Sequence, residues 1–201
     1  MTATTTPPRV AGLLLAAGGG RRLGGRPKAL LEHHGRPLVE HAVRVLREGG
    51  CDPVQVVLGA AADTVLERAE LGGCGVTVNP GWAEGMGSSL RAGLAALAGS
   101  GADAVLVLLV DQPGIGAEAV ARVRRAHPSR GGIAAAAYGG ERGHPVLFGA
   151  ELWARVAAGA VGDRGARGFL RAHRDAITLV ECSDVAEAYD IDTEADLEHL
   201  R

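Results

Sequence analysis

The feature that most constrains the fold is an alternation between short apolar runs and segments whose apolar residues have helical spacing. The apolar runs predict strands at 10–16, 54–58, 76–78 and 104–110. The segments between them predict helices over 37–48, 63–69 and 88–97. This order predicts an α/β fold with a doubly wound, mostly parallel sheet flanked by helices, because parallel neighbours need helical crossovers. The run 104–110 is the most continuous, as is typical of a central strand covered on both faces.

The second half of the chain is less regular. Further strands are predicted at 133–138, 145–148 and 177–182. Further helices are predicted at 117–126, 151–158, 166–173 and 194–200. A chain of 201 residues suffices for one domain with a sizeable core and is short for two. We therefore expect a flexible Thr/Pro-rich tail over 1–9 and a single domain over 10–201.

Charge and cysteine usage limit the classes of function. The net charge of -2 disfavours a nucleic-acid binder. Cys51, Cys74 and Cys182 are far apart and form no C-x-x-C pair, which disfavours a zinc site or a disulfide framework. The first residues do not resemble a signal peptide, and no apolar run approaches the roughly 20 residues of a transmembrane helix. The sequence therefore predicts a cytoplasmic protein with no nucleic-acid or membrane partner.

The loop after the first predicted strand carries the strongest functional signal. From Gly18 to Lys28 it holds five glycines and four cations. Glycines let backbone N–H groups approach an anion closely, and cations supply charge and donors for phosphate oxygens. Ligands of such sheets bind outside the carboxyl ends of the strands, where this loop lies. We interpret it as a phosphate-binding loop; the alternative is a flexible loop whose arginines are only solvated.

Two common phosphate motifs are excluded by particular residues. A Walker loop needs Ser or Thr after its lysine, but Lys28 is followed by Ala29. A dinucleotide fingerprint needs a third glycine where this chain has Leu23, and an acid at the end of the second strand, where it has Leu58 and Gly59. The loop therefore belongs to another class of phosphate site.

Other polar residues follow predicted strands or precede predicted helices. Asp111 directly follows the apolar run 104–110, and one or two carboxylates are what Mg²⁺ takes from a protein when it also binds a triphosphate. The alternative for Asp111 is a turn residue before Pro113. Ser88 and Ser89 begin a predicted helix, where hydroxyls either cap the helix or bind a ligand. No two histidines have the helical spacing of a metal-ligand pair, so no zinc or iron site is predicted.

The loop string from Leu15 to Lys28 resembles the L-A-A-G-x-G-x-R-…-P-K signature of the nucleotidyltransferases that activate sugar phosphates, alditol phosphates and the molybdenum cofactor. The string 79–90 is similar to the N-P-x-W-x-x-G-M-x-x-S-L segment of molybdenum cofactor cytidylyltransferases. Shorter strings of the same relatives occur at 111–113, 143–148, 162–167 and 190–193. The resemblance implies a Rossmann-like nucleotide-diphospho-sugar transferase fold, with a nucleotide-binding half at about 10–113 and an acceptor-binding half at about 114–201.

The resemblance also implies roles for individual residues. It assigns the nucleotide to Leu15, Ala16, Ala17, Gly18, Gly20, Arg22, Lys28, Asn79, Gly85, Ser88, Ser89 and Asp111. Arg22 and Lys28 would be catalytic. The metal, Mg²⁺, would lie on Asp111 and Asp192, with Asp190 as the alternative to Asp192. His144 and Arg167 are the candidates for binding the acceptor, although a lone histidine is more often a core residue satisfied by the backbone.

The resemblance implies transfer of a nucleotidyl group from a triphosphate to a molybdopterin acceptor, with a molybdoenzyme as a transient partner. Ala17 favours CTP, because a methyl group there crowds a larger purine; the guanylyl branch typically has glycine. Two positions depart from the usual pattern: Gly19, where relatives often carry a polar residue, and Leu23, where Met is more usual. The alternatives are a guanylyltransferase using GTP, an NAD(P)-dependent oxidoreductase and a non-catalytic cofactor carrier.

Overall fold

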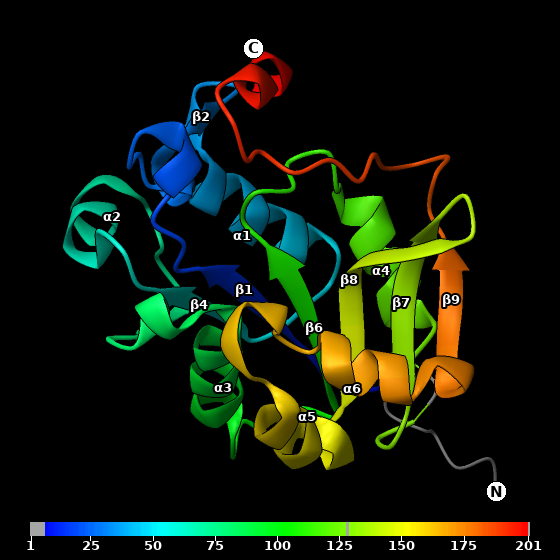
Figure 1. Cartoon of the computed structure of the whole chain (residues 1–201). Coiled ribbons are helices and arrows are strands. Elements are labelled where there is room, and N and C mark those ends of the chain that lie inside the picture. The colour runs from blue at the N-terminus through cyan, green and yellow to red at the C-terminus, as the bar shows by residue number, and fades with distance from the viewer. Residues whose placement is uncertain (1–6, 128, 201) are drawn as a thin grey trace, which may run out of the picture.

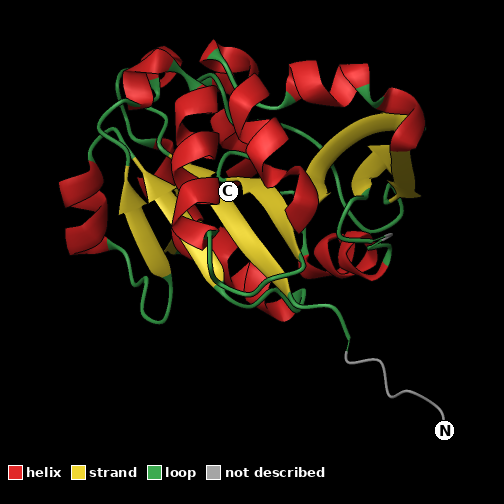
Figure 2. Cartoon of the chain, turned by 90° about the horizontal axis from the view of Figure 1, so that it is seen from below, coloured by secondary structure: helices red, strands yellow, loops and turns green. Residues whose placement is uncertain are grey.

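The structure, a computed structural model, describes residues 7–127 and 129–200. It confirms the predicted fold: a seven-stranded sheet of order β5-β4-β1-β6-β8-β7-β9 has helices on both faces (Figure 1, Figure 2). Its strands are β1 (Val10–Ala16), β4 (Val54–Leu58), β5 (Gly75–Val78), β6 (Ala104–Leu109), β7 (Ile133–Tyr138), β8 (Glu141–Gly149) and β9 (Ile177–Glu181). The α-helices are α1 (Leu38–Glu48), α2 (Ala62–Arg68), α3 (Met86–Leu97), α4 (Ala117–Arg125), α5 (Trp153–Gly159) and α6 (Arg167–Ala172). None of these helices is both long and apolar enough to cross a membrane. Residues 1–6 of the expected tail lie outside the described residues.

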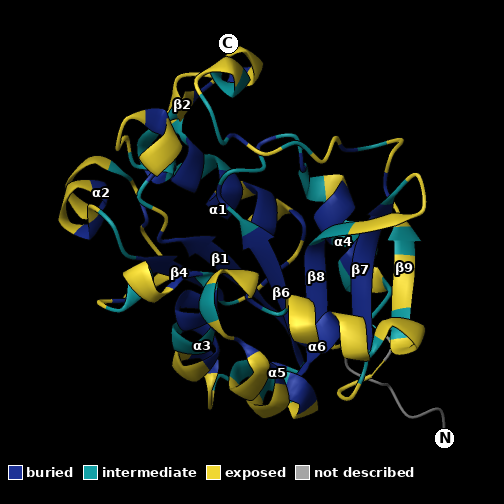
Figure 3. Ribbon diagram, viewed as in Figure 1, coloured by how far each residue is buried: buried dark blue, intermediate teal, exposed yellow. Residues whose placement is uncertain are grey.

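Strand β1 lies at the centre of the parallel part of the sheet. It pairs with β4 on one side and β6 on the other, and every residue of it is buried. Because side chains alternate across a strand, Leu14 packs into the core with α1 and α4, whereas Leu13 packs with α3 on the opposite face. Figure 3 shows these inner strands as buried and β9, at the edge, as largely exposed. The carboxyl ends of β1, β4 and β6 therefore lie along one edge of the sheet.

Strand β8 is the antiparallel member of the sheet. It lies between β6 and β7 and runs opposite to both. The turn from β7 into β8 uses Gly139 and Gly140, whose φ angles of 60° and 84° are in the region that favours glycine. The strand predicted at 145–148 is the buried end of β8. Its exposed beginning escaped prediction because Glu141 and Arg142 break the apolar pattern.

Two local features differ from the prediction. The expected helix at 194–200 is a 3-10 helix over Ala195–Leu200. A small hairpin of β2 (Glu32–His33) and β3 (Arg36–Pro37) precedes α1. A segment of six residues gives little length over which an α-helix is stabilised, and strands of two residues leave no alternation to recognise. Neither feature therefore has a clear signature in the sequence.

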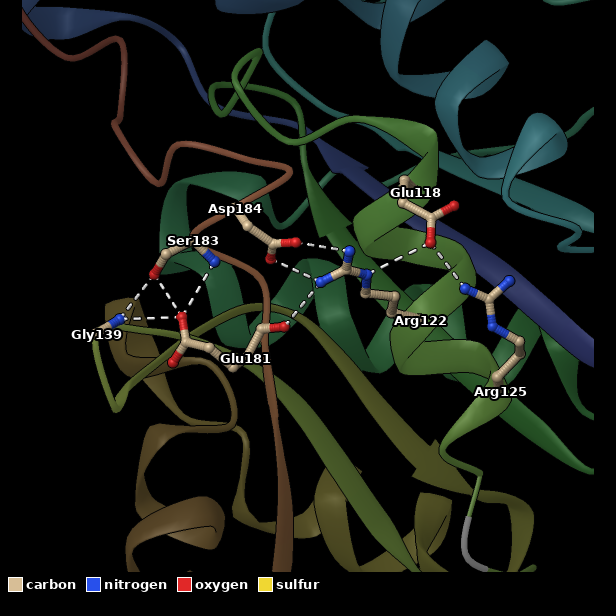
Figure 4. Close-up of polar contacts among 7 residues, drawn as sticks. All are labelled: Glu118, Arg122, Arg125, Gly139, Glu181, Ser183 and Asp184. Atoms are coloured by element: carbon tan, nitrogen blue, oxygen red, sulfur yellow. Dashed lines mark hydrogen bonds and ion pairs between the residues drawn. The ribbon is translucent and has the colours of Figure 1, made fainter.

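The chain after β9, residues 182–200, turns back across the carboxyl edge of the sheet and is called the return segment below (Figure 1). Arg122 of α4 fixes the start of this return segment by donating to both carboxylate oxygens of Asp184, at 2.7 and 2.8 Å, and to the carbonyl oxygen of Glu181 (Figure 4). The Glu181 carboxylate in turn accepts hydrogen bonds from Gly139 and Ser183. The return segment is therefore held both to α4 and to the turn between β7 and β8.

Candidate active site

Gly20 closes the loop between β1 and Lys28. Its backbone is left-handed, with φ of 59°, and its carbonyl oxygen accepts hydrogen bonds from the N–H groups of Leu23 at 2.8 Å and Gly25 at 3.0 Å. A Cβ atom here would collide with the carbonyl group of Arg26. Both the backbone angle and the space therefore require glycine. This arrangement gives Gly20 a role in shaping the loop.

Two apolar residues anchor this loop to the protein core. Leu23 is fully buried, and Ala29 is buried next to Lys28. Between these anchors the chain turns through short 3-10 segments. Arg22 and Lys28 therefore project from a loop that is fixed on both sides. Leu23, which excluded a dinucleotide motif, is here a packing residue.

Two aspartates from distant parts of the chain meet at Lys28. Asp111 follows β6, and Asp192 lies on the return segment. The Lys28 Nζ atom donates to Asp111 Oδ2 at 2.7 Å and to Asp192 Oδ1 at 2.5 Å. Arg22 Nη2 donates to the other oxygen, Asp192 Oδ2, at 2.9 Å. The loop, the end of β6 and the return segment thus form one charged cluster.

The backbone explains why Asp190 and Asp192 of the return segment face this cluster. The Ile191 N–H donates to the Asp111 carbonyl oxygen at 2.8 Å, and the Ile191 side chain is fully buried. Alternate residues of an extended segment share one side, so Asp190 and Asp192 both point away from the core. Asp190 accepts a hydrogen bond from Gln112 Nε2 at 2.7 Å. Three carboxylates therefore lie at the carboxyl end of β6.

Burial and pairing shift the pKa values of the cluster. Burial raises the pKa of the Asp111 carboxyl, and the Lys28 cation opposes that rise. The hydrogen bond from Lys28 lowers the pKa of Asp192. Burial by itself lowers the pKa of Lys28, but Asp111 and Asp192 together outweigh it and raise the value overall. Lys28 is therefore a cation at neutral pH.

A cavity of about 330 Å³ opens beside this cluster. The predicted residues that line it are Leu15, Ala17, Gly18, Arg22, Lys28, Gly85, Ser89, Asp111, Arg167 and Asp192. The predicted residues outside its lining are Ala16, Gly20, Asn79, Ser88 and His144. The cavity therefore brings together residues from both predicted halves of the chain.

Asn79 and Ser88 support the wall of the cavity from behind. Both are buried, and Asn79 Nδ2 donates to the hydroxyl oxygens of Ser88 at 2.8 Å and Ser89 at 3.1 Å. The Ser88 hydroxyl lies 2.9 Å from the carbonyl oxygens of both Gly81 and Gly85, and so ties the first turn of α3 to the loop before it. Of the two serines, Ser89 is the one that lines the cavity.

His144 and Arg167 lie in different pockets. Arg167 lines the main cavity, whereas His144 lines a smaller apolar pocket of about 30 Å³. Leu15, Met86 and Leu109 line both, so the two pockets adjoin. Burial lowers the pKa of His144 to about 4. The imidazole is therefore neutral at physiological pH.

Several residues of the lining were not assigned from the sequence. They are Gly19, Arg21, Trp82, Ala83, Met86, Leu109, Val110 and Asp163. Trp82 and Asp163 both lie within strings that carried the family resemblance, which was the available signal. The two strings touch, since a Cβ on Gly85 would lie 2.6 Å from the Asp163 backbone nitrogen. That close approach cannot be read from the sequence, because the two strings are far apart in the chain.

The donor set fits a cation that takes few protein ligands. Oxygens of Asp111 and Asp192 both bond one ammonium group, so they are close enough to share a single cation. Within residues 7–127 and 129–200, no group of three or more His, Cys, Asp or Glu side chains is placed to hold a metal ion. Mg²⁺ matches two carboxylates, because it completes its shell with waters and phosphate oxygens. A structural zinc site, with four protein ligands, does not match.

Comparison with known proteins identifies the family. Residues 12–177 match the family model described as a MobA-like NTP transferase domain, which spans most of the chain. The chain belongs to this family. The glycine-rich loop, Asp111 and the wall formed by 79–90 all lie inside the matched region of the MobA-like domain, whereas Asp192 lies beyond it.

Two curated relatives of this MobA-like domain have different names. The nicotine blue oxidoreductase of Paenarthrobacter nicotinovorans is 44% identical over 194 residues, covering 92% of this chain and 93% of the relative. The probable molybdenum cofactor guanylyltransferase of Opitutus terrae is 38% identical over 117 residues, covering 58% of this chain and 55% of the relative. Membership of the family therefore does not by itself decide the reaction.

Solved structures share the fold over nearly the whole length. The Rv0371c homologue from Mycobacterium sp. strain JC1 is 32% identical with a TM-score of 0.83, covering 96% of this chain and 94% of that one. The manganese complex of Rv0371c from Mycobacterium tuberculosis H37Rv is 27% identical with a TM-score of 0.77, covering 96% and 97%. One of these structural relatives thus binds a divalent metal.

Proposed function

We propose that this chain transfers a cytidylyl group from CTP to a phosphate of molybdopterin, releasing pyrophosphate. The observation that carries the proposal is the meeting of Lys28, Asp111 and Asp192 beside a cavity walled by the glycine-rich loop. Such a site offers cations for a triphosphate and carboxylates for its metal. The membership of the MobA-like NTP transferase family supports this reaction class.

The proposed reaction is a direct displacement. An oxygen of the acceptor phosphate attacks the α-phosphorus of CTP, and the bond from that phosphorus to the bridging oxygen of pyrophosphate breaks. Lys28 and Arg22 stabilise the negative charge that accumulates on the α-phosphate and on the leaving pyrophosphate. Gly18 and Gly19 line the cavity, and glycines allow backbone N–H groups to approach phosphate oxygens closely. These residues act by positioning and charge, without a covalent nucleophile.

Asp111 and Asp192 are the residues that would hold Mg²⁺. When bound, the ion would supply positive charge that draws electron density from the phosphate oxygens. Asp111 is suited to this role because it is held by the backbone at the end of a buried strand, 21% exposed at its side chain. Asp192 is held in place by Arg22 as well as by Lys28.

Ala17 supports CTP as the donor. It lines the cavity, and its carbonyl oxygen accepts a hydrogen bond from the Ala60 N–H at 3.0 Å, which fixes this part of the wall. Gly59 packs tightly against Ala17 and Trp82, since a Cβ added to Gly59 would lie 2.8 Å from the Ala17 Cβ and 2.5 Å from the Trp82 Cβ. Ala17 therefore has no room to shift toward Gly59. A methyl group on a fixed wall restricts the space for a purine. Ala17→Gly should therefore raise turnover with GTP relative to CTP, measured by competition between the two.

The acceptor end of the cavity is formed by the second half of the chain. Arg167 and Asp163 line it, and His144 lines the adjoining apolar pocket. Arg167 suits an acceptor phosphate, and the neutral His144 suits the edge or face of a flat heterocycle. We assign the acceptor to this end on that basis, and we place the reaction in the cytoplasm, with a molybdoenzyme receiving the product. Arg167→Ala should then raise KM for the acceptor without changing KM for CTP.

The test is pyrophosphate release from each of the four ribonucleoside triphosphates, with Mg²⁺ and molybdenum cofactor. Release from CTP that depends on the cofactor supports the proposal. Release from GTP alone would establish the guanylyltransferase alternative, which the relative from Opitutus terrae supports by its name. Tight cofactor binding with no pyrophosphate from any triphosphate would establish a carrier.

An oxidoreductase is the second candidate, and the relative named nicotine blue oxidoreductase is the observation in its favour. Two features weigh against a nicotinamide dinucleotide bound in the usual way. Strand β4 ends at Leu58 and is followed by Gly59, so no carboxylate stands at its carboxyl end to hold a ribose, and Leu23 fills the position of the third glycine. The discriminating assay follows oxidation of NADH or NADPH with nicotine blue as acceptor. We expect no hydride transfer; rapid NAD(P)H oxidation would favour this candidate.

A further inference from the structure

The Lys28 ammonium group lies between the two carboxylates that would hold the metal. It donates to one oxygen of Asp111 and one oxygen of Asp192, and its side chain is only 14% exposed. A divalent cation shared by those two oxygens needs the same space and the same negative charge. The ammonium and a metal therefore compete for this position.

We propose that Lys28 couples the two ligands: its ammonium group blocks the metal position until the phosphates of a bound nucleotide draw it away. This inference rests on the proposed function, since it takes Asp111 and Asp192 as metal ligands and the cavity as the nucleotide site. It goes beyond that function by assigning Lys28 a second role, which is to keep the site from binding a metal without a nucleotide.

The surroundings of Lys28 allow the exchange. Lysine carries its charge on a flexible four-carbon stem with three rotatable donors, so the ammonium can move while the backbone stays fixed. The backbone next to it is anchored by the buried Ala29, and the side chain lines the cavity into which phosphates would enter. Phosphate oxygens in that cavity offer the ammonium new charge-assisted hydrogen bonds.

Asp192 keeps its place when Lys28 leaves. Arg22 bonds Asp192 Oδ2, the oxygen that Lys28 does not use, and the Ile191 N–H holds the adjacent backbone to Asp111. A second link joins the same segments, since Arg26 Nη2 donates to Glu194 Oε1 at 3.1 Å. The carboxylates are therefore preorganised, and what changes is the cation between them.

Competition between the Lys28 ammonium group and the metal has a thermodynamic consequence. If a bound nucleotide removes a competitor of the metal, then the metal must also strengthen nucleotide binding, because coupling between two ligands is reciprocal. Direct contact between metal and phosphate adds to this coupling in every variant. The contribution of Lys28 to the coupling is therefore measured most directly by the affinity for the metal in the absence of nucleotide.

The experiment measures the binding of Mn²⁺ by electron paramagnetic resonance to the wild-type chain, to Lys28→Met and to Arg22→Met. Arg22→Met is the matched control, because it also removes a cation bonded to Asp192 but not one shared with Asp111. We expect Lys28→Met to bind Mn²⁺ alone about tenfold more tightly than wild type, and Arg22→Met to change by less than about threefold. With a non-hydrolysable CTP analogue, wild type should gain more Mn²⁺ affinity than Lys28→Met.

Equal effects of the two substitutions, or unchanged binding in Lys28→Met, would overturn the proposal. If wild type nevertheless binds Mn²⁺ together with the analogue and turns over CTP, the proposed function survives that result. If wild type binds no Mn²⁺ even with the analogue, the metal role of Asp111 and Asp192 fails as well. Should Lys28→Met not fold, Lys28→Gln replaces it, and the same tightening relative to Arg22→Met is required.

Discussion

Gly20→Ala adds one methyl group at the turn that closes the loop between β1 and Lys28. A left-handed backbone costs a residue with a Cβ about 1–2 kcal/mol. The new atom would also lie 2.9 Å from the Arg26 carbonyl carbon and closer still to its oxygen, and a backbone group cannot rotate away as a side chain can. Relief requires loss of one or both hydrogen bonds to the Gly20 carbonyl, at about 1 kcal/mol each. The local cost is therefore about 2–4 kcal/mol.

Only part of this cost should lower the free energy of unfolding, because the loop can shift locally while the sheet stays folded. The shift moves Arg22 and Lys28, and a displacement of about 1 Å in a positioning group costs about 10²-fold in rate. Pyrophosphate release should fall by about that factor, and the tryptophan fluorescence change on CTP binding, reported by Trp82 in a Trp153→Phe background, should weaken. The urea midpoint should fall less than the activity does.

Gly24→Ala is the matched control in the same loop. Its φ of 66° is equally unfavourable for alanine, but nothing lies within 4 Å of the added Cβ. It should cost about 1–2 kcal/mol of stability and leave the rate within about threefold of wild type. Equal loss of activity in the two variants would refute the argument that the Gly20–Arg26 contact shapes the phosphate loop.

Three other predictions test separate parts of the account. Lys28→Ala should lower pyrophosphate release by about 10²–10³-fold at saturating CTP, by analogy with the loss of one oxyanion donor; near-normal release would contradict the mechanism. His144 has a pKa near 4 when folded against an ordinary 6.5, so the unfolded chain binds more protons between these values and stability should rise with pH across that window. His144→Phe should flatten this rise in urea midpoints taken at successive pH values; an unchanged slope would exclude His144 as its source. Arg122→Ala should lower turnover several-fold, because it releases Asp184 and with it the return segment. Arg125→Ala, which removes only a hydrogen bond to Glu118 within α4, should leave turnover unchanged. Equal turnover in the two variants would show that the anchor is dispensable.

The overall fold was accessible from the sequence because its signal is repeated. The inner parallel strands β1, β4 and β6 are almost entirely apolar, and the helices between them have an apolar face, so several independent segments predict the same sheet. The direction of β8 was not accessible, since its pairing with β6 joins residues far apart in the chain. The hairpin before α1 was missed because two-residue strands have no period.

The candidate site was accessible in part. The loop and Asp111 follow apolar strands directly, so the rule on carboxyl ends of strands brings them together. Asp192 needed the resemblance, because it reaches Lys28 only through the return segment, across 164 positions of sequence. The sequence could not separate residues that face the cavity, such as Ser89, from those that support it from behind, such as Asn79. That distinction depends on the backbone conformation of each segment, which decides the side to which each side chain points.

The most direct test of the central claim is pyrophosphate release measured with each of the four ribonucleoside triphosphates in the presence of Mg²⁺ and molybdenum cofactor. A cytidylyltransferase with Lys28 at its active site should release pyrophosphate from CTP in preference to GTP when the cofactor is present, and Lys28→Ala should lose that release. Absence of pyrophosphate from every triphosphate, together with oxidation of NADH or NADPH by the same preparation, would contradict the proposed function.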